Sequence, residues 1–162
     1  MRIIKYTHSL KDDWDDFVKD SKNSHFFFYR DYMEYHSDRF LDFSLIILDQ
    51  KEKIVALLPA NIKDNVLYSH QGLTFGGFLI NDKMKTETML EVFETLREYS
   101  KKENIQKIIY KCMPYIYHIL PSEEDSYSLF RNDAKLFRRD VTTTIYLSEK
   151  IKYQNTIYCI FL

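Results

Sequence analysis

The spacing of apolar positions predicts one long helix in the second half of this chain. Met89, Val92, Phe93 and Leu96 lie at i, i+3, i+4 and i+7, so a helix would carry all four on one face. The pattern ends near residues 101–102, where two lysines suit the negative end of the helix dipole. This is the clearest helix signal in the sequence.

Continuous apolar runs predict the strands of a sheet. Residues 43–48 and 54–60 flank a polar turn, which indicates an antiparallel hairpin of buried strands. Pro59 has no N–H group, so we expect a bulge or the end of ladder pairing there. Strand-like composition also occurs in residues 3–6, 66–69, 78–80, 106–112, 135–139 and 141–147.

Shorter helices are expected between these strands. Ser9 or Asp12 can cap a first helix, and a second is expected over residues 30–37. Ser122 and Asp125 have the spacing of a capping box, which predicts another helix start. The order of these elements predicts a single α/β lobe whose mixed, mostly antiparallel sheet is flanked by helices.

All three glycines of the chain lie in residues 69–77, which we call the glycine stretch. Glycine permits positive φ values and the close approach of another backbone or a ligand. Two interpretations are open: a bulge or tight turn in a strand, or a cleft whose backbone binds a ligand. The second makes substrate contacts of Ser69, Gln71, Gly72, Gly76 and Gly77. Neither GxGxxG nor GxxxxGK(S/T), the phosphate-binding patterns, occurs in the sequence.

Composition narrows the function classes. A net charge of −1 without a sustained basic block argues against a dedicated nucleic-acid-binding protein. The apolar runs are shorter than the roughly 20 residues of a membrane helix, so we expect no membrane span. The N-terminus lacks the apolar core of a signal peptide, which predicts a cytoplasmic protein. Cys112 and Cys159 lack CxxC spacing, and neither a disulfide framework nor a metal site is predicted.

Two histidines are candidate catalytic residues, because both lie near strand ends, where the cleft residues of α/β folds gather. His70 or His118 could accept a proton from an amine nucleophile, since an unperturbed imidazole titrates near neutral pH. The alternative for each is a hydrogen-bonded structural histidine.

Two further pairs of residues are candidate substrate contacts. Tyr115 and Tyr117 would line a groove, or would simply belong to an aromatic core. Arg138 and Arg139 could hold a phosphate or carboxylate of a donor, or pair with acidic side chains at the surface.

Four segments of the sequence resemble the FemAB-like branch of the GNAT superfamily, whose members contain two tandem GNAT-like halves. The segments are residues 67–77, 110–118, 121–125 and 129–140. The resemblance covers about residues 1–147 and matches only the N-terminal half. We therefore expect residues 1–147 to form one GNAT-like lobe and residues 148–162 to form a hydrophobic tail.

The resemblance implies an N-acyltransferase. Such enzymes pass an acyl or aminoacyl group from a thioester or an aminoacyl-tRNA to an amine, here an amino sugar or another cell-envelope precursor. The amine attacks the carbonyl directly, so the enzyme contributes orientation and stabilises the developing oxyanion.

Two departures from the family limit this expectation. GNAT proteins grip the pyrophosphate of acyl-CoA with a glycine-rich turn before the long helix, whereas residues 80–86 contain no glycine. We therefore expect acetyl-CoA only for a full-length protein and not in this lobe. Residues 148–162 do not resemble the start of a second half, which indicates a truncated product whose tail favours self-association and which is inactive alone. The alternative is a non-catalytic ligand- or protein-binding module with a degenerate GNAT fold.

Overall fold

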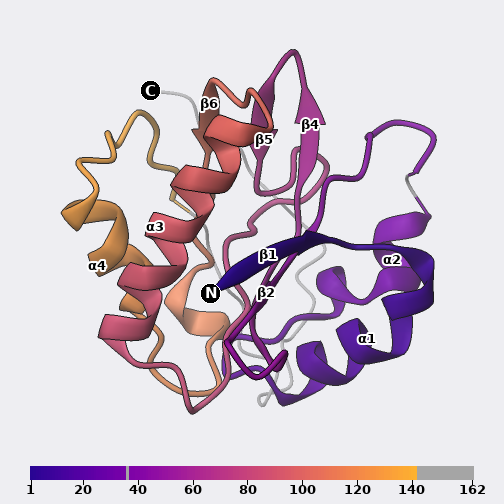
Figure 1. The fold of residues 1–162 in the computed structure, drawn as a ribbon, viewed down its shortest axis with the longest axis horizontal. Coiled ribbons are helices and arrows are strands. Elements are labelled where there is room, and N and C mark those ends of the chain that lie inside the picture. Colours follow the sequence, from indigo (N-terminus) through magenta and orange to yellow (C-terminus); the bar gives the residue numbers. More distant parts are fainter. Residues whose placement is uncertain (36, 142–162) are drawn as a thin grey trace, which may run out of the picture.

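Helices cover both faces of a central set of strands in the computed structural model, which describes residues 1–35 and 37–141. Figure 1 shows α1 (Lys11–Asp20) and α2 (Arg30–Glu34) on one side of the strands. On the other side lie α3 (Thr86–Lys102) and α4 (Glu124–Arg131). The predicted fold class, a mixed α/β lobe with mostly antiparallel strands flanked by helices, is confirmed.

Two three-stranded sheets make up the central layer. The first has the order β1 (Arg2–Lys5), β2 (Leu45–Leu48), β3 (Ile54–Leu58), and all of its pairs are antiparallel. The second has the order β4 (Asn61–Lys63), β5 (Val66–Tyr68), β6 (Lys107–Ile109), in which β5 and β6 are parallel and joined through α3. Pro59 lies between β3 and β4, where ladder pairing stops as expected.

The glycine stretch interrupts a strand. Asn61 pairs with Tyr68, so an uninterrupted antiparallel ladder would place Gly72 opposite Leu57, four positions along each strand. Leu57 instead pairs with Leu79 through two backbone hydrogen bonds of 2.8 and 3.1 Å. The chain therefore inserts seven residues (79 less 72) between two parts of one strand. The insertion is a loop with a turn at residues 71–72, so the turn interpretation of the glycine stretch holds.

Buried side chains divide into two clusters, one on each face of the strands. Leu45 and Ile47 face the α3 side, whereas Ile46 and Leu48 face the α1 and α2 side. This alternation buries both faces of β2 and explains its continuous apolar sequence. The apolar stripe of α3 packs into the first cluster, which confirms the helix predicted from residues 89–96.

Several sequence-based boundaries were wrong. α1 follows Leu10 without a side-chain cap, so neither Ser9 nor Asp12 caps it. α4 begins at Glu124 without a capping box, because its Asp125 side chain bonds elsewhere.

Two extents also differ from the prediction. α2 ends at Glu34 and not at residue 37. Residues 135–139 form no strand, and all five are exposed. The predicted strand 141–147 beyond its first residue, and the whole tail 148–162, lie outside the described residues.

Three short 3-10 turns occur in the described part of the chain, and two of them carry rings that pack on Phe75 of the glycine stretch. They are η2 (Phe26–Phe28), which precedes α2, and η3 (Tyr115–Tyr117), which follows β6; the third, η1 (His8–Leu10), leads into α1. Phe28 is fully buried and its carbonyl accepts the indole N–H of Trp14 at 2.8 Å, whereas Phe26 is 57% exposed. The run of three phenylalanines thus lies partly inside the core and partly at its surface.

Candidate functional site

The glycines of the stretch face the protein's own chain. A Cβ atom on Gly76 would overlap the backbone carbonyl of Ser69, and one on Gly72 would overlap the ring of Phe40. Gly77 has a φ of +90°, which side chains rarely adopt. These close approaches explain the glycines as features of the inserted loop. Ligand contacts by Gly72, Gly76 and Gly77 stay a prediction.

The polar side chains of the stretch also have partners in the fold. The hydroxyl of Ser69 accepts the backbone N–H of Lys111 at 2.7 Å. Gln71 and Asn61 form a pair: the Gln71 N–H donates to Asn61 Oδ1 at 2.7 Å, and Asn61 Nδ2 donates to Gln71 Oε1 at 2.8 Å. Ser69 and Gln71 therefore hold the insertion against β4 and the continuation of β6, and substrate binding by them remains untested.

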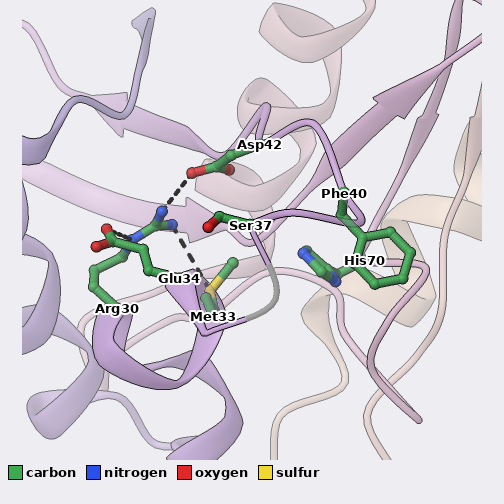
Figure 2. Close-up of a pocket in the computed structure, with 7 residues that line it drawn as sticks. All are labelled: Arg30, Met33, Glu34, Ser37, Phe40, Asp42 and His70. Carbon is green, nitrogen blue, oxygen red and sulfur yellow. Dashed lines mark hydrogen bonds and ion pairs between the residues drawn. The ribbon is translucent and has the colours of Figure 1, made fainter.

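A small hollow with charged residues on one side lies where the glycine stretch meets the end of α2 (Figure 2). Its volume is about 40 Å³, which suits a group the size of a water molecule or an ammonium ion. It is lined by Arg30, Met33, Glu34, Ser37, Phe40, Asp42 and His70. Figure 2 shows His70 and Phe40 on one side, the Arg30 cluster on the other, and Ser37 between them.

Arg30 is the centre of the charged side of the hollow. Only 2% of it is exposed, and its Nε donates to Glu34 Oε1 at 3.2 Å. Its Nη2 pairs with Asp42, and its guanidinium stacks 3.6 Å from the ring centroid of Tyr6. Two carboxylates around one guanidinium leave an excess of one negative charge, which a protonated His8, whose Nδ1 lies 3.7 Å from Glu34 Oε2, would cancel. Such a site attracts a cation more than an anion.

His70 reaches the hollow from the glycine stretch and is only 4% exposed. Its Nδ1 accepts the N–H of Gly72 at 3.2 Å, so the neutral ring carries its proton on Nε2. Its ring packs edge-on against Phe40 with centroids 5.3 Å apart. While the Gly72 bond holds, Nδ1 cannot take a proton from a substrate. The ring is therefore better placed to donate a hydrogen bond than to act as a base.

His118 lies apart from His70 in the fold. It follows η3 and does not line the hollow. The structure does not bring the two candidate histidines into one site, and a catalytic role for His118 stays a prediction.

Tyr117 belongs to an aromatic cluster at the edge of the glycine stretch. Its ring stacks on Phe75 at 5.0 Å and meets His25 at 5.3 Å. Burial lowers the pKa of His25, which favours the neutral imidazole among these rings. Tyr115 is 79% exposed and does not line the hollow. The sequence analysis did not identify His25 as part of this aromatic cluster, although its position directly before three phenylalanines was an available signal.

The two arginines after α4 are surface residues. Arg138 Nε donates to Asp140 at 2.9 Å, which is the surface pairing expected as one alternative. Arg139 is exposed as well. Neither lines the hollow, and a donor-binding role for them remains a prediction.

A buried phenol and carboxyl group connect the chain after β6 to α4, which sequence reasoning also missed. The hydroxyl of Tyr110 donates to Asp125 Oδ2 at 2.7 Å and accepts the Phe78 N–H at 2.7 Å. Burial raises the pKa of the Asp125 carboxyl above its usual value and raises the pKa of the Tyr110 phenol as well.

The backbone of residues 78–80 has no open hydrogen-bonding group. Asn23 Nδ2 donates to the carbonyl of Phe78 at 2.8 Å, and Asn23 Oδ1 accepts the N–H of Ile80 at 3.0 Å. The N–H of Lys22 donates to the Ile80 carbonyl at 2.8 Å. Together with Tyr110 on the Phe78 N–H and Leu57 on Leu79, these bonds satisfy every N–H and carbonyl of the segment. Residues 78–80 therefore offer no free backbone donor or acceptor to an extended ligand.

Among residues 1–35 and 37–141, no group of three or more His, Cys, Asp or Glu side chains is arranged to hold a metal ion. In the same part of the chain, no helix combines the length and the apolar character needed to cross a bilayer.

Comparison with known proteins gives similarity at the level of structure. No protein-family model matches the chain, and curated proteins gave no match. The chain is similar to the crystal structure of a point mutant of TTHA1254 from Thermus thermophilus, with a TM-score of 0.51 and 10% identity over 92% of this chain and 100% of that chain. This shows a shared fold.

Two further solved structures are less similar. A point mutant of BH1408 from Bacillus halodurans has a TM-score of 0.48 and 11% identity, covering 91% of this chain and 100% of that chain. The aminoglycoside 6'-N-acetyltransferase AAC(6')-IG from Acinetobacter haemolyticus has a TM-score of 0.47 and 13% identity, covering 94% of this chain and 100% of that chain. At these scores neither structure carries a functional argument.

Proposed function

We propose that this chain is a GNAT-like, FemAB-like lobe of an N-acyltransferase, which binds the amine acceptor and is incomplete on its own. The observation that carries the proposal is the anionic hollow beside the interrupted strand. Glu34 and Asp42 outnumber the one guanidinium of Arg30, and His70 closes the opposite side. An ammonium group is the common feature of amine acceptors, and it matches this charge and volume.

The hollow limits how much of the acceptor it receives. At about 40 Å³ it takes an amine head group, while a sugar ring or a longer chain stays outside. The proposed class of acceptor, an amino sugar or a cell-envelope precursor, follows from the sequence resemblance. In the reaction, the bound ammonium first gives one proton to water, and the nitrogen of the free amine then attacks the acyl carbon. The bond to the donor's sulfur or oxygen breaks, and the second proton passes from the nitrogen to the departing thiolate or alkoxide. This chain contributes orientation of the nitrogen, a major source of rate enhancement.

Donor binding is proposed to need residues outside this chain. The closed backbone of residues 78–80 and the missing glycine before α3 both oppose acyl-CoA in this lobe. An acyl-CoA or an aminoacyl-tRNA would therefore be held elsewhere in a full-length protein.

Acceptor binding is tested by NMR titration of the isotope-labelled chain with glucosamine, using N-acetylglucosamine as the probe that lacks a basic amine. We expect weak binding, with Kd on the order of 1 mM, and signal changes confined to residues that line the hollow. Glu34→Gln is expected to weaken binding about tenfold, whereas Glu98→Gln on the exposed face of α3 leaves it unchanged. Equal responses to both sugars, or changes away from the hollow, would contradict the proposal.

A second candidate is a non-catalytic ligand- or protein-binding module. The backbone of residues 78–80, in which every N–H and carbonyl already has a partner, favours this second candidate. A lobe that cannot hold a donor transfers no acyl group by itself. Calorimetry of the folded chain with acetyl-CoA addresses the donor directly. We expect no saturable heat. Saturable binding of acetyl-CoA by the wild-type chain would overturn both this second candidate and the statement that residues 78–80 oppose a donor in this lobe.

A further inference from the structure

The side chain of Lys111 bonds to the backbone of the glycine stretch. Its Nζ donates to the carbonyls of His70, Gln71 and Leu73 at 3.0, 3.3 and 2.6 Å. Its own N–H bonds the hydroxyl of Ser69 at 2.7 Å. Among residues 1–35 and 37–141, no carboxylate forms an ion pair with this ammonium, unlike the ammonium of Lys22, which pairs with Glu124.

Three converging carbonyls satisfy all three donors of an ammonium group. The three carbonyls bind the Lys111 ammonium as they would bind a small free cation, and the lysine side chain links this ammonium to the segment that follows β6. Charge-assisted bonds of this kind are roughly twice as strong as neutral ones. Burial, and the nearby charge of Arg138, lower the pKa of Lys111 below its usual value. The carbonyls compensate for the hydration that the ammonium has lost.

The three carbonyls belong to the turn that presents His70. The Leu73 N–H closes this turn by donating to the His70 carbonyl at 3.3 Å, and the Gly72 N–H fixes the imidazole through Nδ1. Without the ammonium, three carbonyls would point at one another with no donor between them. The turn would then relax, and the ring would leave the position that Figure 2 shows beside the hollow.

We propose that Lys111 is a positioning residue that fixes the glycine stretch through these three carbonyls and thereby holds His70 at the hollow. The claim about the stretch stands on geometry alone. Its consequence for acceptor binding rests on the proposed function. Lys111 does not line the hollow and acts only through the backbone.

Hydrogen exchange and NMR of the full chain test this role. Lys111→Met keeps the length of the side chain and removes its donors. We expect amide exchange in residues 70–77 to rise at least about tenfold, the equivalent of one lost charge-assisted bond, while exchange in α3 stays unchanged. The His70 ring signals should move toward those of an exposed histidine. Lys107→Met is the matched control, because Lys107 is exposed on β6; it should change neither measurement.

A chemical rescue makes the test independent of simple destabilisation. In Lys111→Ala, ammonium chloride at about 0.3 M should restore slow exchange in residues 70–77, whereas sodium chloride at the same ionic strength should not. Exchange and His70 signals that stay as in the wild type in Lys111→Met, or loss of order that ammonium does not restore in a folded Lys111→Ala, would overturn the proposal.

Glucosamine binding separates the two claims. If Lys111→Met loosens the stretch and weakens glucosamine binding, the residue positions His70 for the acceptor. If Lys111→Met loosens the stretch but the wild-type chain does not bind glucosamine, the positioning role stands and the proposed acceptor function fails.

Discussion

The carboxyl group of Asp125 becomes buried on folding and accepts a hydrogen bond from the hydroxyl of Tyr110. Its pKa is raised chiefly because burial disfavours the charged form, although the bonds from Tyr110 and the Ser126 N–H oppose that effect. A carboxyl group whose pKa is higher in the folded than in the unfolded state binds its proton more tightly when folded. Its contribution to stability is complete below the ordinary pKa and is lost as pH rises through the folded value.

Asp125→Asn is therefore expected to change how stability depends on pH. Urea unfolding between about pH 4 and pH 7 should show wild-type stability falling relative to the variant as pH rises, since the amide keeps an acceptor for Tyr110 without a charge. The difference between the two proteins cancels the titration of the other acids, whose partners are unchanged. A difference that stays flat or increases with pH would contradict the assigned environment of Asp125.

The glycine stretch is the element that sets this lobe apart from a regular sheet. It inserts seven residues (79 less 72) into a strand, and the insertion closes back on its own start where Gly76 meets the Ser69 carbonyl. A side chain at position 76 would have to displace backbone, whereas one at position 72 meets only the ring of Phe40, which can move. Two glycines of one stretch thus carry different constraints.

Gly76→Ala is expected to destabilise the fold by about 3 kcal/mol, and Gly72→Ala by about 1 kcal/mol, because overpacking costs most where the neighbour is fixed. Urea unfolding at one pH, with comparable m values, measures both. Equal costs for the two substitutions would show that the backbone at Ser69 can move, and the proposed difference between Gly76 and Gly72 would then be wrong.

Short sequence patterns predicted those helices and strands that depend on residues close together in the sequence. The α3 stripe and the hairpin of β2 and β3 follow from spacing and a polar turn alone. The hollow could not be foreseen in this way, because Arg30 and His70 are far apart in sequence and nothing local marks an arginine as buried. The hydrogen bonds of residues 78–80 could not be foreseen either, because two of them come from Asn23, which is far away in the sequence. The capping box failed for the related reason that tertiary partners competed for Asp125.

At the scale of the whole molecule, residues 21–23 connect three parts of the fold. The Lys22 N–H bonds Ile80, and its carbonyl accepts the Ile119 N–H at 2.7 Å. Its ammonium pairs with Glu124 at the start of α4. Asn23 completes the connection by bonding two backbone groups of the interrupted strand. The segment after α1 therefore carries contacts from one helical layer, through the strands, to the other.

Asn23→Ala tests how much of the molecule depends on this connection. It would leave the Phe78 carbonyl and the Ile80 N–H buried without partners, and each such group costs about 1–3 kcal/mol, so we expect a total loss of about 2–4 kcal/mol. Asn81→Ala is the matched control: the Asn81 side chain bonds the Lys83 N–H in an exposed turn, and a change within about 0.5 kcal/mol is expected.

The same variant shows whether the two helical layers unfold together. Urea unfolding followed separately by tryptophan fluorescence and by far-ultraviolet circular dichroism should give coincident transitions in the wild type. Trp14 reports on the α1 side, while α3 is the longest of the described helices and dominates the helical signal. Separated transitions in Asn23→Ala would therefore identify residues 21–23 as the coupling between layers. If the free energy of unfolding of Asn23→Ala falls by less than about 1 kcal/mol, another group must bond the Phe78 carbonyl and the Ile80 N–H. The described role of Asn23 in residues 78–80 would then be wrong.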